Sequence, residues 1–246
     1  CSRDWSSDVC SSDLVGFDTR KDQAGTARLY NVSCILGATS QDGIHWQKTA
    51  APILIWNREF THPWEIVDGK IPPAPANYYG SYHRPSLLFD QGRWKLWFDY
   101  FVPGTFVSLG YAENTGDFTN ASAWKVLRAD DKPLLKDFPN PSVIKANGQY
   151  LAFSDAPYYP PELGGDGRQL TLAVSPDGTT WKVLGHLRPA GMASSHVPQA
   201  LVLPIEGVNW VYVFYSWKPA RQPGQPWDFR YKELRYLRRK LDQLLP

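Results

Sequence analysis

The sequence predicts an all-β fold built from a repeated unit of short strands, and two observations support this prediction. The first is composition: the 246 residues include Trp 11, Tyr 13, Phe 11, Gly 19 and Pro 21. Aromatic residues favour β-strands, and glycine and proline favour the turns between them. The second is a pattern of strands and turns that recurs along the chain at spacings of 56 and 57 residues.

Each repeat opens on a strand that begins with proline, at Pro85, Pro141 and Pro198. A tight turn follows, and an aromatic strand comes after it. These second strands are Trp94–Phe98, Tyr150–Phe153 and Trp210–Tyr215. The third strand is visible at Val107–Ala112 and at Leu170–Ser175.

A second tight turn leads into a fourth strand that begins with tryptophan. The turn reads SQDGIHW over 40–46 and SPDGTTW over 175–181, and a looser version ends at Trp124. The Asp-Gly pairs supply the positive φ that tight hairpins need, and we interpret the tryptophans as residues that pack between units. Four short strands in a unit of this length are typical of a β-propeller blade.

The repeats predict one partial propeller domain over residues 15–246, with about three and a half blades. Two blades are complete, at 82–135 and 138–188; residues 195–240 hold at least three strands, and 28–56 hold the outer half of another blade. The last predicted strand, Phe229–Lys240, carries a basic run that we interpret as a solvated outer edge. The run consists of Lys232, Arg235, Arg238, Arg239 and Lys240.

Residues 1–14 are excluded from the predicted fold. The segment 4–14, DWSSDVCSSDL, matches the translation of a common short-read sequencing adapter, so we expect an artefact fused to a reading frame truncated at its N-terminus. Without this segment Cys34 is the one remaining cysteine. An internal disulfide and a cysteine metal cluster are therefore excluded.

Charge and motifs exclude several classes of function. Lys+Arg 26 against Asp+Glu 24 gives a net charge of +2, which lacks the basic footprint of a nucleic-acid-binding protein. No apolar run is long enough for a membrane-spanning helix. The sequence also lacks the phosphate-binding, zinc-protease and serine-hydrolase motifs.

The long connections point to one working face. In a four-stranded blade, the loops between second and third strands and the loops between blades share a face, and these are the long ones here: 57–81, 99–106, 154–169, 189–196 and 216–228. Function concentrates on loops that a rigid scaffold holds. Their aromatic residues, carboxylates and arginines suit sugars, which stack on rings and accept charge-assisted hydrogen bonds.

The Ser-x-Asp-Gly-x-x-Trp turns and the proline-led inner strands resemble the five-bladed β-propeller superfamily of arabinanases, β-xylosidases, invertases, levansucrases and mannoside phosphorylases (glycoside hydrolase families 32, 43, 68 and 130). The resemblance covers residues 28–240. It implies a five-bladed propeller that lacks one whole blade and half of another upstream. It also implies two essential carboxylates, an acid and a base or nucleophile.

The sequence departs from the family at the places where those carboxylates commonly lie, just before the inner strands. These places read His83-Arg84-Pro85, Pro139-Asn140-Pro141 and His196-Val197-Pro198, with no carboxylate. Other carboxylates are therefore candidates for the acid and base.

We expect Asp99 and Asp155 to be the catalytic carboxylates, together with one from the missing blade, because each ends the second strand of its blade. His83, Arg84 and His196 are expected to orient substrate at the mouth of the channel. The remaining candidates for substrate binding are Tyr158, Asp166, Arg168 and Trp217. For the aspartates the alternative is local, since an aspartate in a turn caps its own backbone.

The resulting hypothesis is a glycoside hydrolase-like enzyme that acts on a polysaccharide or oligosaccharide in a bacterium, in the periplasm or secreted. The first alternative is a non-catalytic carbohydrate-binding propeller that has lost the usual acids. The second is a propeller that binds proteins. We expect no cofactor; the resemblance places a metal ion of the central channel near His196 as the alternative.

Overall fold

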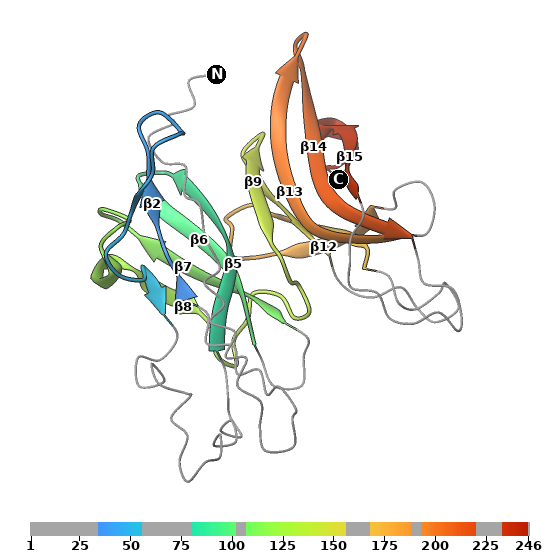
Figure 1. Cartoon of the computed structure of the whole chain (residues 1–246). Helices are drawn as coiled ribbons and strands as arrows, with labels where there is room; N and C mark the ends of the chain where they lie inside the picture. The colour runs from blue at the N-terminus through green and yellow to red at the C-terminus, as the bar shows by residue number, and fades with distance from the viewer. Residues whose placement is uncertain are drawn as a thin grey trace. The chain divides into compact units, whose positions relative to one another are not determined.

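A computed structural model describes residues 34–55, 80–101, 107–155, 168–187, 193–219 and 233–245. These residues are strands, turns and two short 3-10 turns, Ala121–Ala123 and Leu241–Gln243, without an α-helix among them. The predicted all-β fold class is therefore confirmed. The chain divides into two compact units, Cys1–Pro133 and Leu134–Pro246, which Figure 1 shows in blue to green and in yellow to red.

The first unit contains a four-stranded antiparallel sheet whose strands pair in chain order, as in a propeller blade. Its strands are β5 (Gly80–Asp90), β6 (Arg93–Phe101), β7 (Ser108–Asn114) and β8 (Lys125–Arg128). A hairpin from the predicted half-blade precedes it, in which β1 pairs with β4 and β2 with β3. Its pieces are β1 (Cys34–Ile35), β2 (Ala38–Thr39), β3 (Gln47–Lys48) and β4 (Leu54–Ile55).

The core of the first unit lies between this hairpin and the sheet. Side chains on one face of β6, among them Leu96 and Phe98, are fully buried and pack with Ile35 and Ile53 of the hairpin region. Alternate residues of a strand point to opposite faces, so the aromatic run predicted for the second strand supplies both faces of β6. Trp97 packs on Tyr111 from the other face, with ring centroids 5.4 Å apart.

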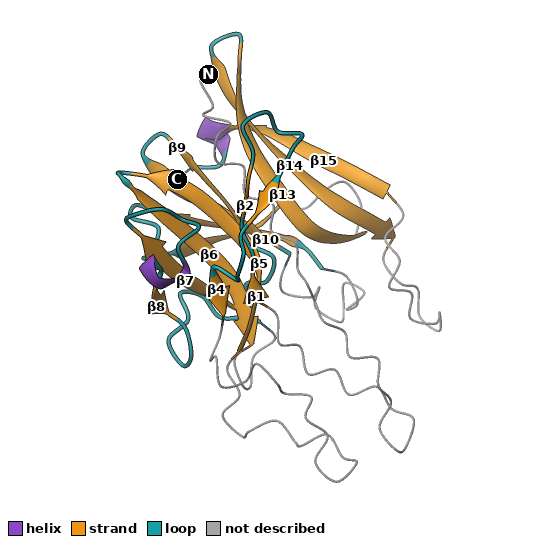
Figure 2. Cartoon of the chain, turned by 60° about the vertical axis from the view of Figure 1, so that its left-hand side comes forward, coloured by secondary structure: helices purple, strands orange, loops and turns teal. Residues whose placement is uncertain are grey.

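The second unit contains two antiparallel sheets. One is four-stranded, with β9 (Ser142–Ala146), β10 (Gln149–Ser154), β11 (Leu170–Ser175) and β12 (Lys182–Leu187). The other is three-stranded, with β13 (Ala193–Ile205), β14 (Val208–Pro219) and β15 (Glu233–Lys240). Figures 1 and 2 show β13 and β14 as a long, curved hairpin.

The two sheets of the second unit share one hydrophobic core. Leu151 and Phe153 of β10 and Leu172 of β11 pack in it with Val211 and Val213 of β14. All five side chains are 3% exposed or less, so the apolar faces of the two sheets meet as neighbouring blades do. The strand order and this packing agree with a partial propeller, and the number of blades stays a prediction.

The two Ser-x-Asp-Gly-x-x-Trp turns close themselves by the same hydrogen bonds. Oδ1 of Asp42 and Oδ1 of Asp177 each accept from the backbone N–H groups two and three residues later, at 2.6–2.8 Å. The indole Nε1 donates to the carbonyl of the glycine in the same turn, at 3.2 Å for Trp46 and 2.9 Å for Trp181. These aspartates and tryptophans therefore build the hairpins.

Candidate functional site

The same strained backbone conformation recurs directly before the proline of all three inner strands. Arg84, Asn140 and Val197, each directly before the strand's proline, have φ of 49°, 49° and 51°, in the left-handed region that residues other than glycine rarely adopt. In β5 the ladder register shifts between His83 and Ser86 and in β13 between His196 and Gln199. Such bulges redirect side chains. Two clusters of hydrogen bonds form at these places, one around Asp99 and one around Asp155, and we call each cluster a corner.

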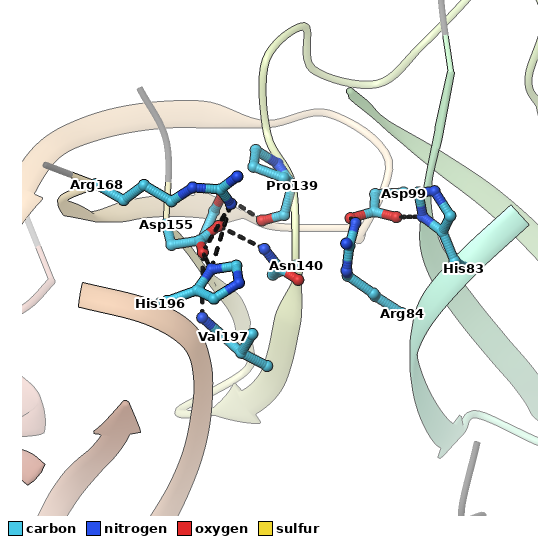
Figure 3. Close-up of polar contacts among 10 residues, drawn as sticks. His83, Arg84, Asp99, Pro139, Asn140, Asp155, Arg168, His196 and Val197 are labelled. Atoms are coloured by element: carbon cyan, nitrogen blue, oxygen red, sulfur yellow. Dashed lines mark hydrogen bonds and ion pairs between the residues drawn. The ribbon is translucent and has the colours of Figure 1, made fainter. Parts of the chain in front are cut away.

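The Asp99 corner is formed by His83, Arg84 and Asp99 in the first unit (Figure 3). Asp99 lies opposite His83 in the register of β5 and β6, and His83 Nδ1 is hydrogen bonded to Asp99 Oδ1. Arg84 Nη1 donates to Asp99 Oδ2 at 3.1 Å. Asp99 is 0% exposed, whereas the side chain of Arg84 is 38% exposed. The buried carboxylate therefore holds the guanidinium of a side chain that reaches the surface.

The Asp155 corner, in the second unit, collects partners from both sheets (Figure 3). Asn140 Nδ2 donates to Asp155 Oδ1 at 2.7 Å, and Arg168 Nη1 donates to Oδ2 at 3.1 Å. His196 Nδ1 is hydrogen bonded to the same Oδ2, and the backbone N–H of Val197 donates to it at 3.1 Å. Asp155 therefore ties the loop end of β10 to the start of β13.

One residue in each corner, Asp155 and His83, has a pKa below its ordinary value. Burial alone would raise the pKa of Asp155, but the hydrogen bond and charge of His196, the charge of Arg168 and the Asn140 hydrogen bond outweigh it, so the pKa lies below its ordinary value. Burial, aided by the charge of Arg84, lowers the pKa of His83 to about 3. Asp155 is thus a stable anion and His83 a neutral imidazole at neutral pH.

Of the nine predicted site residues, the structure places six at the two corners: His83, Arg84 and Asp99 at one, and Asp155, Arg168 and His196 at the other. It does not join Trp217 to the hydrogen bonds described for the Asp155 corner. Trp217 lies opposite Ser195 in the register of β13 and β14 and packs on the hydrophobic core. The guanidinium of Arg235 covers one face of its ring, 3.5 Å from the centroid. Tyr158 and Asp166 lie outside the described residues.

Sequence reasoning missed two members of the Asp155 corner. Asn140 and Val197 occupy the positions just before an inner-strand proline, where the family pattern has its carboxylates. Their residue types did not indicate a functional role. Val197 contributes only its backbone N–H, and Asn140 contributes a neutral amide in place of a carboxylate. The recurrence of this position before all three prolines was the available signal.

The metal ion that the resemblance places near His196 finds no matching ligand set here. The described ranges contain no group of three or more histidine, cysteine, aspartate or glutamate side chains arranged to hold a metal. We therefore derive no step through a metal.

Within the described ranges, no helix has the length and apolar character needed to cross a membrane.

Comparisons with known proteins identify similar solved structures only. No protein-family model and no curated protein matches the chain. It is similar to the GH32 β-fructofuranosidase BmSUC1 of Bombyx mori, with a TM-score of 0.49, 10% identity, and coverage of 89% of this chain and 41% of that one. It is also similar to a putative glycoside hydrolase from Parabacteroides distasonis, with a TM-score of 0.49, 14% identity, and coverage of 88% and 59%.

A third similar structure is the sucrose-6-phosphate hydrolase from Lactobacillus gasseri, with a TM-score of 0.49, 14% identity, and coverage of 84% of this chain and 36% of that one. The chain therefore spans between about a third and three fifths of the length of these three proteins.

Proposed function

We propose that this protein is carbohydrate-active and binds sugar through its two corners. The observation that carries the proposal is the recurrence of one arrangement: a buried aspartate that holds a histidine and an arginine, once as Asp99 with His83 and Arg84 and once as Asp155 with His196 and Arg168. The two sets are built differently, since His83 and Arg84 are adjacent in the sequence, whereas Arg168 precedes β11 and His196 lies in β13.

The arrangement supports sugar binding because it fixes planar hydrogen-bonding groups. A buried, ionised carboxylate holds a guanidinium and an imidazole in one geometry, so little side-chain entropy is lost when they bind a ligand. Sugars are recognised by directed hydrogen bonds to their hydroxyl groups. Both aspartates are 0% exposed, and they therefore act in this proposal as positioning residues behind the groups that touch the ligand.

Glycoside hydrolysis is the second candidate, with Asp99 and Asp155 as its carboxylates. The lowered pKa of Asp155 suits a group that must stay ionised, as a nucleophile or base does. It does not suit a general acid, which needs a raised pKa. A hydrolase would therefore take its proton donor from another residue. The resemblance of the blade motifs to the five-bladed superfamily supports this candidate as well.

One pair of assays tests both candidates. The full chain is screened for release of reducing sugar from a polysaccharide panel and for binding to the same panel by affinity electrophoresis, beside Asp99→Asn and Asp155→Asn. We expect binding by the wild type and weaker binding by both variants. Release that either substitution abolishes while binding persists would establish hydrolysis. Absence of both release and binding across the panel would overturn the proposal. Far-UV circular dichroism checks that each variant is folded.

A further inference from the structure

The imidazole of His83 is held in one tautomer. A carboxylate offers acceptors only, so the Nδ1 atom that faces Asp99 Oδ1 carries the proton of that hydrogen bond. In a neutral ring the other nitrogen, Nε2, then has a lone pair and accepts. Across the part of the chain that the structure describes, Asp99 is the one hydrogen-bond partner of His83.

The neutral state of this ring follows from its surroundings. The His83 side chain is 9% exposed, and burial disfavours a second proton. The charged groups described against it are Asp99 from β6 and Arg84 from its own strand, and those two already form an ion pair at 3.1 Å. The carboxylate is therefore neutralised by the guanidinium and does not require a charged imidazole.

The same carboxylate thus holds two groups of opposite hydrogen-bonding character. His83 supplies an acceptor at Nε2, and the guanidinium of Arg84, whose side chain is 38% exposed, supplies donors. A hydroxyl group satisfies both, because it donates one hydrogen bond and accepts others. A carboxylate or sulfate group has no proton to donate, and its oxygen would meet the lone pair of Nε2.

We propose that the Asp99 corner is a subsite that binds a hydroxyl group of a neutral sugar. It discriminates against sugars that carry a carboxylate or sulfate at that position. His83 and Arg84 contact the ligand, and Asp99 is a positioning residue. The inference rests on the proposed carbohydrate function and deepens it by naming the class of sugar. A site that hydrogen bonds a hydroxyl rejects a ligand that cannot reproduce the bond.

The first test compares two ligands that differ in one group. Isothermal titration calorimetry measures the full chain against galacto-oligosaccharides and against oligogalacturonides of equal length. A parallel pair is glucose and glucuronate oligomers of equal length and linkage. We expect at least tenfold tighter binding of the neutral member of a pair. Equal or tighter binding of the acidic member would overturn the inference and leave the carbohydrate function standing.

The second test separates the two nitrogens of His83. An asparagine amide places a donor near the position of Nδ1, so His83→Asn keeps the bond to Asp99 and removes the acceptor. A glutamine amide reaches the position of Nε2, so His83→Gln keeps an acceptor there. We expect His83→Asn to weaken neutral-sugar binding at least tenfold and His83→Gln to stay within about threefold. His45→Asn, at an exposed histidine, is the control and leaves binding unchanged.

The dependence of sugar affinity on pH tests the protonation state of His83. A purely structural role of this residue would make no prediction about that dependence. Because the ring of His83 is neutral throughout, the ratio of the wild-type affinity to the His83→Gln affinity for a neutral sugar stays constant between pH 5 and pH 8. This ratio separates His83 from the histidine of the other corner. A tenfold rise across pH 6 to 7 in the wild type that His83→Gln lacks would show that His83 titrates and would overturn the inference. The ligand comparison uses the wild type alone, so it decides the question even if a variant fails to fold. Absence of binding by any oligosaccharide would overturn the carbohydrate function, and the subsite with it.

Discussion

The backbone N–H of Val197 donates a hydrogen bond to Asp155 Oδ2 at 3.1 Å while Val197 has a φ of 51°. A β-branched residue is a clear outlier in this region, and the left-handed conformation costs an L-residue roughly 1–2 kcal/mol. Backbone strain of this kind persists where the surrounding structure requires it. Here it turns the N–H of β13 toward the buried carboxylate of the neighbouring sheet.

Relief of this strain predicts that Val197→Asn stabilises the protein by about 1 kcal/mol, because asparagine tolerates the left-handed region. The Val197 side chain is 40% exposed, so little apolar burial is lost, and the N–H donor remains. Urea unfolding followed by tryptophan fluorescence measures the change. The matched control is Val183→Asn in β12, at 46% exposure and without a positive φ, which we expect to destabilise by about 0.5 kcal/mol. Equal effects of the two substitutions would contradict the prediction.

The strands of this fold were predictable because their signals are local. These signals are a proline in an inner strand, an Asp-Gly pair in a turn and a tryptophan after the turn, and each involves only a few neighbouring residues. The observed strands β6, β10, β11 and β14 each include the whole strand that was predicted. The sheet of β13, β14 and β15 likewise agrees with the prediction of at least three strands over residues 195–240.

The site was predictable only in part, because its hydrogen bonds join residues far apart in the sequence. The recurrence of aspartate at the end of a second strand identified Asp99 and Asp155. Neither the register that sets His83 opposite Asp99 nor the bulge that turns Val197 toward Asp155 follows from residue type. Those features depend on strand pairing and on the packing of one sheet against the next. His196 was predicted as a ligand-orienting residue, and its contact with Asp155 across 41 residues was not.

Asp155 is expected to be a main source of stability in the second unit. Removal of one partner from a buried ion pair leaves the others without compensation, which costs about 3–5 kcal/mol. Asp155→Asn leaves Arg168 and His196 without their anion. Its amide also replaces one acceptor oxygen by a donor, which then faces donor groups at either oxygen position. We therefore expect a loss of about 3 kcal/mol in urea unfolding. Asp242→Asn, at an exposed aspartate, is the control, and a loss below about 1 kcal/mol for Asp155→Asn would contradict this assignment.

The dependence of the free energy of unfolding on pH in the acid range should also depend on Asp155. The pKa of Asp155 in the folded state is lower than its ordinary value of 3.8. A group with a depressed folded pKa contributes stability that is fully present above its unfolded pKa and is lost as pH falls through the folded one. The free energy of unfolding of the wild type should therefore fall as pH drops below 3.8.

Asp155→Asn should show a shallower fall over that range. Part of the slope remains, since the pKa values of Asp42, Asp117 and Asp177 are also lowered by their turn hydrogen bonds. Urea unfolding at pH 2 to 6 gives both curves. Parallel curves for the wild type and the variant would show that Asp155 is not protonated on unfolding in this range.

Gly110 is expected to be intolerant of any side chain, because Phe98 occupies the space. The two residues are register partners in β7 and β6, and a Cβ on Gly110 would overlap the ring of Phe98. Phe98 is fully buried in the core of the first unit, so the ring has little room to move. Overpacking of this kind costs about 1–3 kcal/mol, and we expect Gly110→Ala to lower the free energy of unfolding by that amount.

The control is Gly116→Ala, where an added Cβ meets only Asn114 Oδ1 at 3.7 Å, an ordinary contact. We expect it to change stability by less than about 0.5 kcal/mol. The double variant Phe98→Leu with Gly110→Ala should recover part of the loss relative to the sum of the two single variants, because the smaller side chain vacates the space that alanine needs. Strict additivity of the two substitutions in urea unfolding would show that the Phe98 ring is not what excludes a side chain at Gly110.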